Sequence, residues 1–274
     1  MLTWRNESGI IEIFNLIIMR IINIVIKYLA FIVILTSILG CDKHSASLNS
    51  KEFKYPKSKI WAHKVNDTLV AQAKKELFAG LEVDLIYSEY QNQLIVGHND
   101  CDTIYKLTFE QWLSSLSKHS DCCYWLDIKN LSEKNADSVA SIVSALINKF
   151  KINKNQIMIE HTDCNALVTI KNNGLFVLLW IYEYPEATKQ DTALWIENAK
   201  EMAAKLEPDA ISAHIDMHPL LSNTFPGRNI HYWNTPIKNY ESNLVLTEEL
   251  CKVSNVKVVL VDYDVPLPLT AKTN

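Results

Sequence analysis

The stretch GLEVDLIYSEYQNQLIVGHND, residues 80–100, combines an apolar, strand-like segment with acidic side chains two positions apart. This two-residue period predicts a β-strand with two different faces. Glu82 and Asp84 then share one face, and the leucine and valine residues around them share the other, where they would pack against helices. The second apolar run, residues 91–98, is predicted to be an additional extended piece, a hairpin in the loop that follows the strand.

Seven other segments have the same strand-like composition as residues 80–87. They are residues 59–65, 123–129, 156–162, 175–182, 210–215, 230–235 and 256–263. Helix-like segments, with apolar residues three and four positions apart, lie between most of these strands. They are residues 67–79, 108–118, 135–150, 163–173, 191–206 and 247–253. Alternating strands and helices need a parallel sheet with crossover helices, and eight units in about 220 residues predict a (β/α)8 TIM barrel over residues 57–274.

Local signals support these boundaries, because polar residues stand where helices should begin and glycines where helices should end. The predicted N-caps are Asp67, Thr108, Asn135 and Asp163, and the predicted C-cap glycines are Gly80 and Gly174. Residues 216–229 contain Pro219 and Pro226 and are too interrupted for a full helix. The alternative architecture, an open doubly wound sheet, would need a glycine-rich phosphate turn, which this chain with six glycines lacks.

The composition is that of a globular protein with one large core. Of the 274 residues, 48% are hydrophobic and 21% are charged, which argues against wholesale disorder. The formal net charge is -4, and acidic and basic residues are interspersed without a Lys/Arg-rich run. This charge pattern gives no field that would attract nucleic acid, so no nucleic-acid partner is expected.

The most apolar run of the chain, residues 16–40, ends directly before Cys41. Read from Met19, the sequence has a short basic start, an apolar segment and a glycine before the cysteine, the layout of a cleaved export signal. It resembles a bacterial lipoprotein signal, in which ILGC is the lipobox and Cys41 the lipid-bearing first residue of the mature chain. We therefore expect an exported lipoprotein anchored to the membrane of the bacterial cell envelope, with residues 1–40 as extension and signal and residues 41–56 as linker. The alternative is an uncleaved membrane helix.

The cysteines give little guidance on further cross-links. With Cys41 lipidated, five cysteines remain, an odd number, so at least one has no partner within the chain. An exported location would permit disulfides. The adjacent Cys122 and Cys123 point to opposite faces of a strand and cannot bind one zinc ion together.

Polar residues at the C-terminal ends of the strands are the informative ones, because active sites of such barrels lie there. Glu82 and Asp84 on one predicted strand and Asp127 on the next bring three carboxylates to one barrel mouth. Burying three like charges is unfavourable unless a cation neutralises them. Oxygen ligands without cysteine favour one Mg²⁺ or Ca²⁺ ion over zinc. The alternative is a surface turn in which the acids are simply solvated.

Two histidines and a lysine accompany the acids. His63 ends the first predicted strand and His98 follows the hairpin, and imidazole can act as general acid or base near neutral pH. Lys129, two residues after Asp127, shares its face and adds a positive charge of the kind that holds a phosphoryl oxygen. A glycosidase could also use two barrel carboxylates, but residues two apart on one strand lie closer than the roughly 5 Å needed across a glycosidic bond.

The order of the motifs WAHKVND, EVD, VGHND and LDIK resembles the glycerophosphodiester phosphodiesterase-like branch of the phospholipase C-like barrels, mainly over residues 59–130. The resemblance implies catalytic His63 and His98, one divalent cation on Glu82, Asp84 and Asp127, and a phosphate-contacting Lys129. The chain departs from the His-Arg and Glu-x-Lys motifs usual in the bacterial diesterases. Its aspartate at the third site is similar to sphingomyelinase D-type members, and WAHKVN, TFEQWL and WLDIK look like menorin-type relatives.

The resemblance implies metal-dependent cleavage of a phosphodiester, by hydrolysis or through a cyclic phosphate. The expected partner is a small-molecule or lipid phosphodiester, either a glycerophosphodiester or a phospholipid head group. The residues expected to bind it are Lys64, Asn66, Glu160 and Trp233, although a lone aromatic such as Trp233 also suits a core position. Two further polar residues at strand ends, His214 and Asp262, have no motif that assigns them. The alternative function is a non-catalytic, menorin-like envelope lipoprotein that binds a phosphorylated or lipid ligand.

Overall fold

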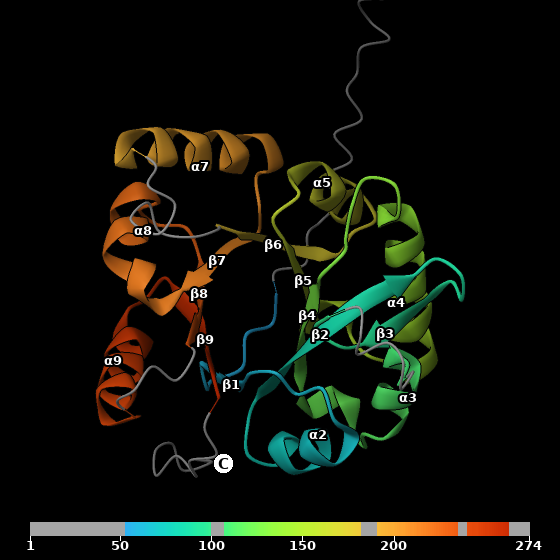
Figure 1. The fold of residues 1–274 in the computed structure, drawn as a ribbon. Coiled ribbons are helices and arrows are strands. Elements are labelled where there is room, and N and C mark those ends of the chain that lie inside the picture. Colours follow the sequence, from blue (N-terminus) through green and yellow to red (C-terminus); the bar gives the residue numbers. More distant parts are fainter. Residues whose placement is uncertain (1–52, 100–106, 182–190, 235–239, 263–274) are drawn as a thin grey trace, which may run out of the picture. The chain divides into compact units, whose positions relative to one another are not determined.

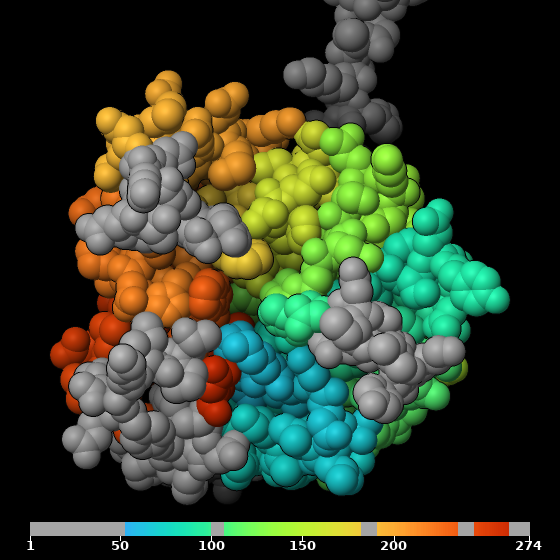
Figure 2. Space-filling view, in the orientation of Figure 1, coloured from blue at the N-terminus to red at the C-terminus, as the bar shows by residue number. Residues whose placement is uncertain are grey.

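The computed structural model describes residues 53–99, 107–181, 191–234 and 240–262. Its parallel strands form a closed ring, because the first strand pairs with the last as well as with the second (Figure 1). In the space-filling view, the blue N-terminal part of the described chain meets the red C-terminal part where this ring closes (Figure 2). The predicted TIM barrel is thus confirmed, and the open doubly wound sheet is wrong.

All eight predicted strands are present in the barrel. They are β1 (Ile60–Ala62), β2 (Gly80–Ser88), β4 (Cys123–Ile128), β5 (Ile157–His161), β6 (Phe176–Trp180), β7 (Ala210–His214), β8 (Ile230–Asn234) and β9 (Val256–Val261). The predicted hairpin is also confirmed, since β3 (Gln93–Val96) runs antiparallel to β2 and places Val96 opposite Leu85.

Helices cover the outside of the barrel (Figure 1). They are α2 (Thr68–Lys75), α3 (Phe109–Ser114), α4 (Ala136–Phe150), α5 (Cys164–Asn172), α7 (Thr192–Leu206), α8 (His218–Thr224) and α9 (Tyr240–Lys252), with 3₁₀ turns at His119–Asp121, Lys154–Gln156 and Ile215–Met217. Asp67, Thr108 and Asp163 accept backbone hydrogen bonds as N-caps, as predicted. Asn135 does not cap α4 with its side chain, which instead accepts a hydrogen bond from the Ser132 amide.

The alternation of side chains along the strands produces two apolar layers. The larger layer lies between strands and helices and contains Leu81, Val83 and Leu85, as the pattern of β2 predicts. The smaller layer fills the barrel interior with residues such as Trp125 and Leu260. Buried side chains therefore close the lower barrel, and the strand ends above them are left for polar residues.

Gly80 has a different role from the predicted helix cap. It opens β2, whereas α2 ends four residues earlier with Glu76 as its C-cap. A Cβ atom at position 80 would lie 2.2 Å from the indole of Trp61, which is fully buried in the barrel interior. Gly80 is therefore required by the close approach of this ring rather than by the end of a helix. Gly174, by contrast, follows α5 with a φ of +77°, as expected of a C-cap glycine.

The folded unit includes residues from the end of the predicted linker. Phe53 is buried and packs in the interior layer. The hydroxyl of Tyr55 and Nε2 of His231 share a hydrogen bond of 2.9 Å. Burial lowers the pKa of His231 to about 3, with a further contribution from Lys257, so this imidazole is neutral. Residues 53–55 thus join the barrel core, and the barrel begins before residue 57.

The predicted export signal and the predicted lipidation of Cys41 lie outside the described residues, and so does Cys101. Cys122, Cys123, Cys164 and Cys251 form no disulfide in the described part of the chain. Cys122 lies in the outer layer and Cys123 in the interior layer, which confirms that they face opposite ways. Within the described ranges, no helix is both long and apolar enough to span a membrane.

Candidate active site

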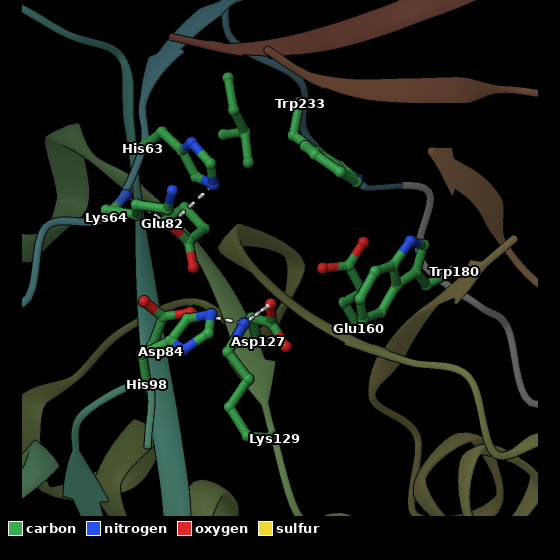
Figure 3. A pocket seen from close by; sticks show the side chains of 11 residues that line it. His63, Lys64, Glu82, Asp84, His98, Asp127, Lys129, Glu160, Trp180 and Trp233 are labelled. Carbon is green, nitrogen blue, oxygen red and sulfur yellow. Dashed lines mark hydrogen bonds and ion pairs between the residues drawn. The ribbon is translucent and has the colours of Figure 1, made fainter. Parts of the chain in front are cut away.

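A cavity of about 120 Å³ opens at the C-terminal ends of the barrel strands. Its walls bring together residues from seven strand ends and from the loop after β3. They are His63, Lys64, Glu82, Asp84, His98, Asp127, Lys129, Glu160, Trp180, Trp233 and Leu260 (Figure 3). With the exception of Asn66, every residue predicted to belong to the site lines this cavity.

Strand register places the acids in neighbouring positions. Asp84 of β2 lies opposite Asp127 of β4, and Asp127 lies opposite Glu160 of β5. Residues opposite each other on parallel strands point to the same face, so these carboxylates form a row across three strands. Glu82, two positions before Asp84, points to the same side.

Glu82, Asp84 and Asp127 form a compact carboxylate cluster. Each offers an oxygen atom that lies within 4.8 Å of the corresponding atoms of the other two. Glu82 is 1% exposed and Asp84 is 2% exposed, so water solvates neither of them well. The surface-turn alternative for these acids is therefore wrong.

Lys129 supplies a positive charge to this cluster. Its Nζ lies 2.7 Å from Oδ1 of Asp84 and 2.5 Å from Oδ2 of Asp127 (Figure 3). Burial alone would lower the pKa of Lys129, but the two carboxylates outweigh it and raise the pKa above its ordinary value. The lysine therefore remains charged and offsets part of the repulsion among the acids.

One lysine does not neutralise three buried acids. Burial raises the pKa of Glu82 well above its ordinary value, and the negative charges of Asp84 and Asp127 raise it further. The hydrogen bond from the Lys64 amide and the charge of Lys129 lower this pKa, but they do not cancel the increase. Burial likewise raises the pKa of Asp127, although Lys129 opposes the shift. Glu82 and Asp127 thus hold their protons more tightly than solvated acids would, and a bound cation would favour their ionised forms.

The donor set fits one divalent cation. All three ligands are hard oxygens, and Oε1 of Glu82 has no hydrogen-bond partner among the described residues. Two ligand atoms 4.8 Å apart can still contact one ion, because Ca²⁺–oxygen bonds are about 2.3–2.6 Å long. Glu82, Asp84 and Asp127 would hold this ion, as the sequence predicts.

Two groups from the loop after β1 orient the carboxylates. The amide of Lys64 donates a 2.6 Å hydrogen bond to Oε2 of Glu82. Asn66 donates from Nδ2 to Oδ2 of Asp84 at 2.7 Å and accepts from the Asp84 amide at 3.0 Å. Asn66 therefore lies behind Asp84 and acts on the pocket through this carboxylate. The sequence points to Asn66 by its place after the first strand, but this reciprocal contact needs the folded loop.

Replacing Asn66 with alanine is expected to weaken Mg²⁺ or Ca²⁺ binding by about 10- to 100-fold, because a ligand that loses its supporting hydrogen bonds is no longer held in place. Titration calorimetry of the full chain measures the change directly. Asn173→Ala, on the far end of α5, is the matched control and should bind the ion as wild type does. Equal affinities in wild type and Asn66→Ala would show that the contact does not support a ligand.

His63 is oriented by an acid from the last strand. Its Nδ1 lies 2.7 Å from Oδ1 of Asp262, directly after β9, and its Nε2 lies 3.8 Å from Oε2 of Glu82. Burial raises the pKa of Asp262, but the hydrogen bond and charge of His63, together with Lys64 and Lys74, bring it below its ordinary value. Asp262 is therefore an anion that holds one imidazole nitrogen and leaves the other facing the cavity.

His98 enters the cavity from the loop after β3. The amide of Gly97 donates a 3.0 Å hydrogen bond to the carbonyl of Asp84, which ties the start of this loop to the end of β2. Figure 3 shows the His98 ring beside Asp84, and its Nδ1 lies 3.2 Å from Oδ1 of Asn99. The two predicted histidines thus border the same carboxylate cluster from different elements.

The opposite wall of the cavity is aromatic. Trp180 and Trp233 meet edge to face, with ring centroids 6.2 Å apart at 83°, and His214 packs against Trp233. Glu160 lies next to Trp180 (Figure 3). Its Oε2 accepts a 3.1 Å hydrogen bond from Nε1 of Trp125. Burial and the negative charge of Asp127 raise the pKa of Glu160 to about 8. Hydrogen bonds with Ser212 and Trp125 and the positive charge of Lys129 lower this pKa, but by less. Trp233 thus lines the cavity, and Trp180 joins it although no sequence motif points to it.

No family model and no curated protein match this sequence. Solved structures of similar fold include a glycerophosphodiester phosphodiesterase from Parabacteroides distasonis, 13% identical over 76% of this chain and 93% of that one, with a TM-score of 0.53. Another is the glycerophosphodiester phosphodiesterase from Thermotoga maritima, 15% identical over 76% and 95%, with a TM-score of 0.50. A phosphodiesterase from Oleispira antarctica, in complex with the product sn-glycerol-3-phosphate, is 10% identical over 75% and 92%, with a TM-score of 0.50.

These likenesses show that the chain has the barrel fold found in glycerophosphodiester phosphodiesterases, as the motif order implies. The described chain spans nearly the full length of those barrels, so the similarity is one of whole domains. At such low identity the fold alone is shared, and the activity has to be argued from this chain's own residues. The similarities to sphingomyelinase D-type and menorin-type proteins stay predictions.

Proposed function

We propose that this protein is a metal-dependent phosphodiesterase that cleaves a glycerophosphodiester or a phospholipid head group. The observation that carries the proposal is one cavity in which a buried three-carboxylate cluster, a charged lysine and a carboxylate-oriented histidine converge. Together these components can supply proton transfer and charge stabilisation for the cleavage of a phosphodiester. The likeness to phosphodiesterases from three organisms supports the same class of reaction.

The positive charges prepare the cavity for a phosphate. A Mg²⁺ or Ca²⁺ ion on Glu82, Asp84 and Asp127 would supply charge stabilisation for the phosphoryl oxygens. Lys129 lies at the same carboxylate cluster, so its ammonium group would bind a non-bridging oxygen of the phosphate and hold the diester next to this cluster. Lys64, on the rim, adds a second positive charge for substrate binding.

The two histidines carry the protons. One imidazole takes a proton from the nucleophile, which is either water or a neighbouring hydroxyl of the substrate. As the new bond to phosphorus forms, the bond to the leaving alcohol breaks, and the other imidazole gives that oxygen a proton. Water as nucleophile yields a monoester, and a substrate hydroxyl yields a cyclic phosphate. Asp262 keeps Nε2 of His63 directed toward the reacting groups.

A panel of phosphodiesters tests the proposal. The full chain would be incubated with Mg²⁺ or Ca²⁺ and with glycerophosphodiesters, lysophospholipids, sphingomyelin and bis(p-nitrophenyl) phosphate. Phosphorus NMR then distinguishes a monoester from a cyclic product. Cleavage that stops with a chelator supports the enzyme. Binding of head groups without cleavage of any diester would contradict it and favour the non-catalytic lipoprotein.

The proposed location is the bacterial cell envelope, with the chain anchored through a lipid on Cys41. The sequence ILGC before the linker supports it. A Cys41→Ser variant should lose both signal cleavage and the lipid, which intact mass spectrometry of the membrane fraction measures. A wild-type protein that keeps residues 1–40 would instead support the uncleaved helix.

A further inference from the structure

The cavity has two chemically different halves (Figure 3). The carboxylate cluster, Lys129 and the histidines form one half, whereas Trp180, Trp233 and Glu160 form the other. The reaction proposed above uses the first half only. The second half contains two large aromatic surfaces and a buried acid that have no part in moving protons or holding phosphate.

Glu160 is a buried acid without a cation of its own. It is 4% exposed, Oε1 has no hydrogen-bond partner among the described residues, and Oε2 accepts a hydrogen bond from the indole N–H of Trp125. It lies outside the group of acids whose ligand atoms are within 4.8 Å of one another. One divalent ion and Lys129 would balance the three acids of that group and leave Glu160 without a counter-charge, so a cation bound beside its carboxyl group would favour the ionised form. Figure 3 shows its carboxylate directed into the cavity.

The aromatic rings stand where they can contact a ligand next to this acid. Trp180 and Trp233 meet at 83°, which gives the corner two nearly perpendicular walls. Both rings line the cavity together with Glu160. The faces of indole rings attract cations, and a corner of aromatic rings with an acid nearby is the arrangement that binds quaternary ammonium groups.

We propose that Glu160, Trp180 and Trp233 form a binding site for the quaternary ammonium group of the substrate, so that the preferred diester carries a choline-type head group. This inference rests on the proposed phosphodiester cleavage, since the diester's phosphate would occupy the other half of the cavity. A quaternary ammonium group has no N–H to donate. It therefore suits aromatic walls and a carboxylate better than a primary ammonium group, which needs several acceptors.

The neutral isostere of choline tests the site without requiring catalysis. Calorimetric titration of the full chain with choline and with 3,3-dimethylbutanol compares ligands of one shape, of which only choline is charged. Choline is expected to bind about 5- to 30-fold more tightly, the range that desolvated cation–π contacts provide. Glu160→Gln keeps an acceptor for Trp125 and removes the charge, so it should abolish this preference. Glu110→Gln, an exposed glutamate paired with Lys149 outside the barrel, should keep it.

Turnover gives the second readout. Wild type should show a similar preference in kcat/KM for glycerophosphocholine over its 3,3-dimethylbutyl analogue. In Glu160→Gln and Trp233→Leu, the ratio of the two kcat/KM values should fall to about one, whatever the rate of each variant on the neutral analogue. Equal binding of choline and the alcohol, or a preference that survives in Glu160→Gln, would overturn the site. If no diester is cleaved but choline still binds selectively, the proposed catalysis fails and the cation site stands. Circular dichroism of each variant confirms that it is folded.

Discussion

Replacing His63 with alanine is expected to lower kcat for diester cleavage by about 100- to 10,000-fold, the contribution of a positioned general acid or base. The imidazole is held by Asp262, whose Oδ1 lies 2.7 Å from Nδ1 of His63. Its Nε2 is therefore the atom that can exchange a proton in the cavity. Initial rates on a glycerophosphodiester, whose leaving alcohol needs a proton, at saturating divalent ion measure the loss.

Ion binding and a second histidine variant separate catalysis from damage to the fold. Calorimetry should show that His63→Ala binds the ion with wild-type affinity, because His63 is not one of the carboxylate ligands. His119→Ala is the matched control, since this histidine bonds to the Tyr124 hydroxyl and packs on Phe150 away from the cavity. A His63→Ala protein that keeps more than a tenth of the wild-type rate would remove this residue from the mechanism.

Without a divalent ion, the free energy of unfolding is expected to fall as pH rises from about 5 to about 8, by a few kcal/mol. Burial raises the pKa values of Glu82, Asp127 and Glu160, the last to about 8. Between the unfolded and folded pKa values, the folded chain retains protons that the unfolded chain has released. Stability is therefore fully present below the unfolded values and is lost as pH rises toward the folded ones.

Added Mg²⁺ or Ca²⁺ should reverse this loss, and most strongly at the alkaline end, because protons no longer compete for the ligands. An ion at about 100 times its dissociation constant adds about 2.7 kcal/mol. Denaturant unfolding at several pH values, with chelator and with ion, measures both effects. Asp84→Asn should abolish the gain from the ion. Stability of the ion-free protein that rises steadily over this range would contradict the proposed charge balance.

The barrel could be predicted because its pattern is local. Each strand is a short apolar run, each crossover helix has its own periodicity, and the strands came out within three residues of the predicted ends. The part of the site on β2 and β4 was predictable for the same reason. Glu82 and Asp84 share a face by alternation alone, and Asp127 and Lys129 repeat this arrangement on the neighbouring strand.

The remaining contacts depend on closure of the ring. Asp262 meets His63 only because β9 pairs with β1, so residues at opposite ends of the barrel sequence become neighbours. A closed barrel implies that pairing, and the strand-end position of Asp262 was the signal that could have revealed it. The contacts of Asn66 with Asp84 and of Gly80 with Trp61 depend on loop path and ring placement, which strand periodicity does not encode.

Diester turnover by the full chain, measured against occupancy of its divalent site, shows whether cleavage depends on the metal ion. We expect turnover to rise in proportion to the binding of one Mg²⁺ or Ca²⁺ ion per chain, and to vanish together with that ion in Asp84→Asn. Turnover that is unchanged when the ion is removed would contradict metal-dependent cleavage. Equal affinities of wild type and Asp84→Asn for the ion would contradict the carboxylate site.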